Sequence, residues 1–145
     1  MTEVINNQRK IKLDWRIYQP FTEKAVETVT ETGNKSVTVA FVSDRKMKRL
    51  NYEFRGKKAT TDVLSFPFET GESEFSFEEN DSLGDIVISV EQAEKQAAEN
   101  NLSLEKEIKQ LILHGILHLC GFDHETDDGE MNSLELQYRD KLKIS

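Results

Sequence analysis

The sequence has few of the features that mark exported, membrane-spanning or disulfide-linked proteins. Only one of its 145 residues is cysteine, so no disulfide can form within the chain, which is typical of a reducing compartment. The longest apolar runs, such as 39–42 and 111–113, are far shorter than the roughly 18 residues that a membrane-spanning helix needs. The first ten residues hold no apolar stretch of signal-peptide length. We therefore expect a cytoplasmic protein that does not bind a membrane.

Basic residues are also in deficit. The chain has 27 acidic residues against 19 Lys plus Arg, and its formal net charge is −8. This average disfavours a protein that binds polyanions nonspecifically. The hydrophobic share of 37% and the charged share of 32% are typical of a globular protein with a core, and exclude a disordered chain. The length predicts a single domain over residues 1–145.

Helix and strand signals are interspersed along the chain. Four segments rich in β-branched and apolar residues predict strands: 4–6, 36–42, 63–66 and 85–89. Five segments with helical spacing or capping residues predict helices: 15–32, 44–52, 90–101, 104–120 and 127–143. Segment 54–61 reads as a loop, and the acidic segment 69–82 as a surface loop or hairpin. The pattern predicts an α+β or mixed-sheet α/β fold.

All three histidines lie within eleven residues, in the run HGILHLCGFDH at 114–124. His114 and His118 are four residues apart on a predicted helix, so their imidazoles leave the same face one turn apart. Gly121 ends the helix and lets the chain bring His124 back toward them. Three protein ligands with an open fourth position are typical of catalytic zinc. Cys120 is a possible rival ligand, but it points away from this face, which favours a small core residue.

The histidine spacing is also that of the metzincin proteases, which place a glutamate directly after the first histidine as general base. Gly115 occupies that position here and cannot accept a proton. Met131 could correspond to the methionine that follows the third histidine in those proteases, although a core position on the last helix is favoured. Three neutral imidazoles leave the +2 charge of a metal uncompensated, which favours a phosphodiester substrate over a peptide.

Segment 45–58 (RKMKRLNYEFRGKK) holds seven of the nineteen basic residues and one acidic residue, Glu53. Tyr52 and Phe54 lie among these cations. Cations contact backbone phosphates and aromatic rings stack on bases, so the segment is a candidate surface for single-stranded RNA. A basic helix that is merely solvated is the alternative. The net charge of −8 thus combines the basic segment 45–58 with an acidic remainder of the chain. This distribution of charge favours selective RNA binding.

Four segments together resemble the YbeY family of bacterial metal-dependent endoribonucleases. They are FRGK at 54–57, TDVLSFP at 61–67, LGDIVI at 83–88 and the histidine run. The resemblance extends from about Val37 to Leu142, and Lys58-Ala59-Thr60 departs from the family's usual Asp-Lys-Pro. It implies a single α+β domain with a mixed sheet of about four strands, and a metal site at the end of a helix in the C-terminal half.

The resemblance also implies a zinc-dependent endoribonuclease with one zinc ion per chain, held by His114, His118 and His124. Its implied role is maturation of rRNA, notably of the 3′ end of small-subunit rRNA, and ribosome quality control. The expected partners are rRNA, the small ribosomal subunit and single-stranded RNA, with no DNA. Arg55 matches the arginine that the family places near the metal.

These residues give a mechanistic hypothesis. The metal activates water or polarises a phosphoryl oxygen, and Arg55 stabilises the negative charge that develops on the phosphate. Asp123 either orients a ligand histidine or is an ordinary turn residue. Further RNA contacts are expected from Arg49, Lys57 and Lys58. Two rival functions remain: a metallopeptidase or other zinc hydrolase, and a non-catalytic ribosome assembly factor that contains zinc.

Overall fold

A four-stranded mixed sheet forms the centre of the computed structural model, which describes residues 2–68, 82–122 and 129–145. The strands are β1 (Glu3–Asn6), β2 (Ser36–Val42), β3 (Val63–Pro67) and β4 (Ser82–Ser89), in the spatial order β1-β2-β4-β3. The strand β2 pairs in parallel with both β1 and β4, whereas β3 is antiparallel to β4. The edge position of β3 accommodates Pro67, which has no N–H to donate to a further strand.

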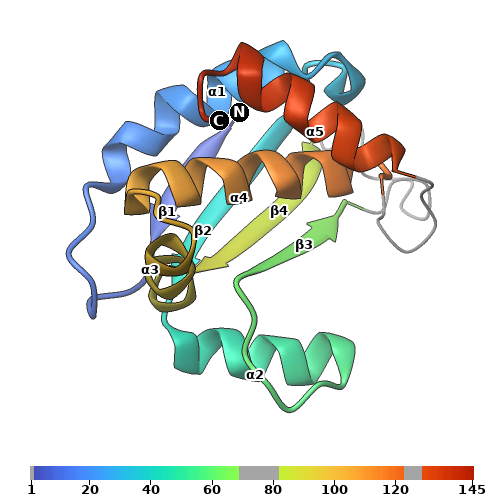
Figure 1. Cartoon of the computed structure of the whole chain (residues 1–145). Coiled ribbons are helices and arrows are strands. Elements are labelled where there is room, and N and C mark those ends of the chain that lie inside the picture. The colour runs from blue at the N-terminus through green and yellow to red at the C-terminus, as the bar shows by residue number, and fades with distance from the viewer. Residues whose placement is uncertain (1, 69–81, 123–128) are drawn as a thin grey trace, which may run out of the picture.

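Helices cover both faces of this sheet (Figure 1). The helices are α1 (Tyr18–Thr28), α2 (Asp44–Arg55), α3 (Val90–Glu99), α4 (Leu104–Leu119) and α5 (Glu130–Lys141), with short 3-10 turns η1 (Trp15–Ile17) and η2 (Thr30–Thr32). Side chains alternate along a strand, so Ile86 and Ile88 of β4 enter the main core with α1, α4 and α5. Val87, between them, faces Met47 of α2 on the opposite side. The predicted α+β fold is confirmed.

Serine residues begin three of the helices, as the sequence indicates. The side chain of Ser43 accepts a hydrogen bond from the Lys46 N–H, and the side chain of Ser103 accepts one from the Lys106 N–H. Ser89 ends β4 and caps α3 directly, accepting from the Gln92 N–H. Each cap satisfies a backbone donor that the first turn of a helix leaves free. These caps fix where α2 begins after β2, where α3 begins after β4, and where α4 begins after α3.

The first expected helix, 15–32, is interrupted in the structure. Val29 is extended, with φ −79° and ψ 98°, and separates α1 from η2. The buried hydroxyl of Thr32 donates to the carbonyl oxygens of Val26 at 2.7 Å and Val29 at 2.9 Å. A threonine hydroxyl that captures backbone carbonyls competes with helical hydrogen bonding. The helical spacing of the apolar residues therefore persists across a break that a side-chain hydrogen bond stabilises.

Helix boundaries also differ from the expectation at α2. This helix continues to Arg55 and ends at Gly56, which adopts the left-handed conformation with φ 68°. Phe54 and Arg55 are therefore helical, although the sequence placed them in a loop. Left-handed residues also follow α3 and α5, at Asn101 and Lys143, so these two helices end two residues early. Residues 69–81 of the acidic segment 69–82 lie outside the described residues, as does Asp127, whereas Ser82 begins β4. No described helix is long and apolar enough to cross a membrane.

Candidate functional site

His114 and His118 meet on one face of α4. Their Nε2 atoms lie 3.0 Å apart, and their ring centroids are separated by 4.6 Å. Two nitrogen lone pairs at this separation repel each other unless a proton or a metal ion lies between them. Both rings are partly exposed, so solvent and a substrate can reach the pair. The predicted juxtaposition of these two histidines is confirmed.

Glu135 of α5 holds the other side of the His114 ring. The Nδ1–H of His114 donates to Oε1 of Glu135 at 2.6 Å, and the Glu135 side chain is only 6% exposed. The second carboxylate oxygen of Glu135 accepts from Nη2 of Arg139 at 2.9 Å. The carboxylate fixes the proton of His114 on Nδ1, which leaves a lone pair on Nε2. This tautomer is the one in which Nε2 can bind a metal ion.

The donor set fits a zinc ion. Two nitrogen atoms bound at about 2.0–2.1 Å to one tetrahedral ion would lie about 3.3 Å apart, close to the separation in this pair. A carboxylate on the far nitrogen is the usual partner of a metal-binding histidine. The expected third ligand, His124, and the expected orienting residue, Asp123, lie outside the described residues. Within the described ranges, no group of three His, Cys, Asp or Glu side chains forms a metal site.

Gly115 faces the sheet instead of the histidine pair. A Cβ atom built on it would lie 2.8–3.0 Å from three side-chain carbons of Ile86, closer than ordinary contact. The glycine therefore lets α4 pack tightly on β4, and a glutamate at this position would not reach the histidine face. Ser65 of β3 donates to the Gly115 carbonyl oxygen at 3.5 Å. The close packing of α4 on β4 thus explains why this position holds a glycine and not a proton acceptor.

Cys120 and Met131 both belong to the core. Met131 is fully buried, and Cys120 is half-buried against the main cluster. Burial, together with the charge of Glu31, raises the pKa of the Cys120 thiol to about 11. A thiol must lose its proton to become a zinc ligand. Both core assignments made from the sequence are confirmed.

The basic segment forms a surface pocket on α2. Five side chains line a hollow of about 400 Å³: Arg45, Lys48, Arg49, Tyr52 and Lys58. Arg49 also lies 3.9 Å from Glu53, both largely exposed, so this ion pair contributes little to stability. Tyr52 is 53% exposed, which leaves its ring available for stacking. Two predicted RNA contacts, Arg49 and Lys58, thus share one pocket, and Lys57 is exposed beside it in the chain.

Arg55 is exposed at the C-terminal end of α2. No hydrogen bond or ion pair joins it to His114 or His118 within the described part of the chain. Its neighbour Phe54 packs edge-to-face against Phe66 of β3, with ring centroids 5.1 Å apart. Phe66 follows Ser65, whose hydroxyl donates to the Gly115 carbonyl beside His114. The strand β3 therefore connects the end of α2 to the histidine-bearing turn of α4.

The comparisons with known proteins assign the family. The family model described as "Endoribonuclease YbeY" matches residues 3–143. The chain belongs to the YbeY family. It is 37% identical over 157 residues to "Endoribonuclease YbeY" of Thermodesulfovibrio yellowstonii, covering 97% of this chain and 96% of that protein. It is 45% identical over 103 residues to the Campylobacter jejuni protein of the same name, covering 71% and 72% of the two chains.

A solved structure agrees with this YbeY assignment. The solution structure of TM1509 from Thermotoga maritima superposes with a TM-score of 0.65 at 32% sequence identity. The match covers 97% of this chain and 89% of that one. The similarity therefore includes the whole sheet and the helices that carry the candidate site, from β1 to α5.

Sequence reasoning missed two residues of this YbeY chain's site. Glu135 and Arg139 lie on α5, more than twenty positions after His114. Their own four-residue spacing indicates an ion pair on one helix face, which the structure contains. Nothing local indicates that this pair faces the histidines, because that contact depends on how α5 packs against α4.

Proposed function

We propose that this chain is an endoribonuclease that cleaves single-stranded RNA and matures rRNA, notably the 3′ end of small-subunit rRNA. The observation that carries the proposal is the histidine pair, whose Nε2 atoms lie 3.0 Å apart while Glu135 holds the other nitrogen of His114. The relatives at 36–45% identity bear the name "Endoribonuclease YbeY". The same proposal includes a role in ribosome quality control, action in the cytoplasm and binding to the small ribosomal subunit. It does not include DNA or a membrane as a partner.

One zinc ion per chain would be held by His114, His118 and His124. When bound, zinc supplies Lewis acidity toward a phosphoryl oxygen and lowers the pKa of water. Glu135 contributes by keeping His114 in the metal-binding tautomer, and Arg139 compensates the charge of Glu135. Asp123 is a second candidate for orienting a ligand histidine.

The chain's cations would bind the RNA. Arg49, Lys57 and Lys58 lie on an exposed basic surface that can track the phosphate backbone, and Tyr52 offers a ring for stacking. Arg55 would stabilise the charge on the phosphate as an oxygen nucleophile forms a bond to phosphorus and the leaving oxygen departs. That nucleophile is water in hydrolysis and the neighbouring 2′-hydroxyl in transesterification. A guanidinium suits this task because it can donate to two phosphate oxygens at once.

The rival functions fit the geometry less well. A metallopeptidase of the metzincin type needs a proton acceptor after the first histidine, and Gly115 there packs against Ile86. An assembly factor with structural zinc would need a closed ligand set, whereas this pair is partly exposed to solvent. A screen with peptide substrates tests the first rival, and RNA cleavage tests the second.

The proposal is tested by metal analysis of the purified protein together with cleavage of defined rRNA precursors. We expect about one zinc ion per chain and cleavage under single-turnover conditions. The Arg55→Ala variant should keep its metal and lose cleavage. Unchanged cleavage by this variant would refute the role of Arg55, and a wild type without RNA cleavage would refute the function. Preparing all variants in parallel controls for contaminating nucleases.

A further inference from the structure

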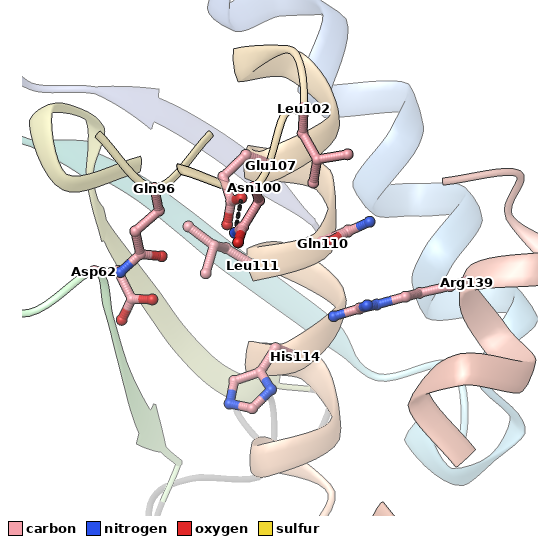
Figure 2. A pocket seen from close by; sticks show the side chains of 9 residues that line it. All are labelled: Asp62, Gln96, Asn100, Leu102, Glu107, Gln110, Leu111, His114 and Arg139. Carbon is pink, nitrogen blue, oxygen red and sulfur yellow. Dashed lines mark hydrogen bonds between the residues drawn. The ribbon is translucent and has the colours of Figure 1, made fainter. Parts of the chain in front are cut away.

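A polar cavity of about 450 Å³ lies beside His114, between α3, α4 and the C-terminal half of α5 (Figure 2). Its walls carry Asp62, Gln96, Asn100, Leu102, Glu107, Gln110, Leu111, His114 and Arg139. Four of these residues form one stripe of α4, at positions 107, 110, 111 and 114. Glu107 and His114 are seven positions apart, which corresponds to about 10 Å along the helix. The cavity therefore extends away from the candidate metal site along α4.

The polar groups of this cavity are rich in hydrogen-bond acceptors. Asn100 donates from Nδ2 to Oε1 of Glu107 at 3.1 Å, and Gln110 donates from Nε2 to the Ile144 carbonyl at 2.6 Å. Each amide thus uses one N–H within the protein and keeps its carbonyl oxygen, together with a second N–H, for a ligand. Asp62 accepts from the Val63 N–H and from the Thr61 hydroxyl, both through Oδ1, and Glu107 is a buried carboxylate with 5% exposure. Ionised carboxylates only accept hydrogen bonds.

The carboxylates of the cavity disfavour a phosphate ligand. Asp62 and Glu107 would repel an anion, and the charge of Arg139 is offset by its ion pair with Glu135 through Nη2, although its buried Nε has no hydrogen-bond partner in the described part of the chain. Leu102 and Leu111 add apolar surface next to these acceptors, as Figure 2 shows. A planar, uncharged ring with N–H donors on its edge would satisfy both the apolar and the polar walls. The volume lies within the range of small-ligand sites.

We propose that this cavity binds a nucleobase with amino donors, guanine above all, from a nucleotide next to the phosphate at His114. The proposal rests on the proposed endoribonuclease function for its source of ligand. Guanine presents two adjacent donors, N1–H and the N2 amino group, which match one carboxylate. Uracil places its single N–H between two carbonyl oxygens, which the carboxylates would repel. Single-stranded RNA is commonly read in this way, through the Watson–Crick edges of unstacked bases.

The test is a titration of the full chain with GMP and with UMP, followed by ¹⁵N-¹H NMR spectroscopy. The two probes share a phosphate, so a difference in affinity reports the base. GMP should shift the side-chain amide signals of Gln96, Asn100 and Gln110, and should bind about tenfold more tightly than UMP. Equal affinities would overturn the proposal, as would GMP shifts confined to α2. Either result leaves RNA cleavage to be judged separately, so it does not decide the proposed function.

Two variants assign the preference to the carboxylates. Glu107→Gln keeps the shape and an oxygen for Asn100 but adds a donor, so most of the preference for GMP should disappear. Asp62 is only partly buried, so Asp62→Asn provides the same comparison if the substitution of the buried Glu107 impairs folding. The matched control is Glu99→Gln, an exposed residue of α3 that does not line the cavity. A GMP preference that survives in both Glu107→Gln and Asp62→Asn would contradict the assignment.

Discussion

The Nδ1 atom of His114 lies 2.6 Å from Oε1 of Glu135, and this contact joins the two helices α4 and α5. The carboxylate is almost fully buried, and Arg139 accounts for its second oxygen. A buried carboxylate at this distance restricts the rotation of the imidazole and fixes which nitrogen carries the proton. The Nε2 atom of His114 is thereby presented to His118.

Removing this carboxylate should weaken metal binding. We expect Glu135→Ala to reduce zinc affinity by about 10–100-fold, measured by competition with a chromophoric chelator. Glu135→Gln should lose less, because its amide oxygen can still accept from Nδ1–H. The control is Asp140→Asn, an exposed residue of the same helix, which should bind zinc as the wild type does. Wild-type affinity in Glu135→Ala would show that the hydrogen bond does not position His114 for metal.

The pocket on α2 should contribute electrostatic affinity without sequence preference. The double variant Arg49→Ala/Lys58→Ala removes two of its cations, so binding to single-stranded RNA of any sequence should weaken. The dependence of log K on log salt should become shallower by about 1.4, which is about 0.7 for each lost phosphate contact. Fluorescence anisotropy at several salt concentrations measures both. The matched control is Lys24→Ala/Lys35→Ala, on exposed residues outside the pocket; an equal loss there would indicate a nonspecific charge effect.

Tight packing at Gly115 predicts a loss of stability on substitution. In Gly115→Ala the new methyl group would meet Ile86, whose branched side chain can move little. Overpacking costs about 1–3 kcal/mol, and the better helix propensity of alanine recovers up to about 1 kcal/mol. We therefore expect a net loss of about 1 kcal/mol in the free energy of unfolding by urea. Combination with Ile86→Val should cost less than the sum of the two single changes, and strict additivity would argue against the contact.

The hydrogen bond between Tyr138 and Glu31 predicts a pH-dependent contribution to stability. The Tyr138 hydroxyl donates to Oε1 of Glu31 at 2.6 Å, and this bond lowers the pKa of the Glu31 carboxyl. Because the folded-state pKa lies below the unfolded one, the stabilisation is present at neutral pH. It is lost as the pH falls through the folded-state pKa and the carboxyl is protonated. Glu31 is exposed, so the contribution is about 0.5 kcal/mol.

Urea unfolding of the wild type and of Tyr138→Phe at pH 7 and pH 3 measures this contribution. The variant should be less stable at pH 7, and the difference should shrink at pH 3. Glu31→Gln is the control, because an amide does not titrate, and Tyr138→Phe in that background should show no such pH dependence. A difference in the wild-type background that grows at pH 3 would have the wrong sign for this hydrogen bond.

Much of the fold could be predicted because its signals are local. Alternation of β-branched residues indicates β2, and the serines at 43, 89 and 103 mark three helix starts that the structure contains. The histidine pair was also predictable, since a four-residue spacing on a helix sets two side chains one turn apart. The predicted helix boundaries were wrong where the conformation of one residue, and not the apolar spacing, decides where a helix ends. The hydroxyl of Thr32 stabilises a break after α1, and Gly56 ends α2 later than its apolar spacing indicates.

The rest of the site depends on tertiary packing. Glu135 reaches His114 only because α5 packs against α4, and neighbouring residues in the sequence carry no signal of that contact. The cavity beside His114 combines Asp62 before β3 with Gln96 of α3 and Arg139 of α5. Three segments so far apart can be brought together only by the complete fold. The ligation by His124 and the role of Asp123 remain predictions, because both residues lie outside the described part of the chain.

Single-turnover cleavage of a defined single-stranded rRNA precursor tests the central claim most directly. Four samples are compared: the metal-free wild type, the wild type reloaded with zinc, and His118→Ala with and without added zinc. Zinc should restore cleavage to the wild type, while His118→Ala should bind no stoichiometric metal and should stay inactive in both samples. Equal cleavage rates in the metal-free and zinc-loaded wild type, or cleavage by His118→Ala at the wild-type rate, would contradict a metal-dependent endoribonuclease built on the pair His114 and His118.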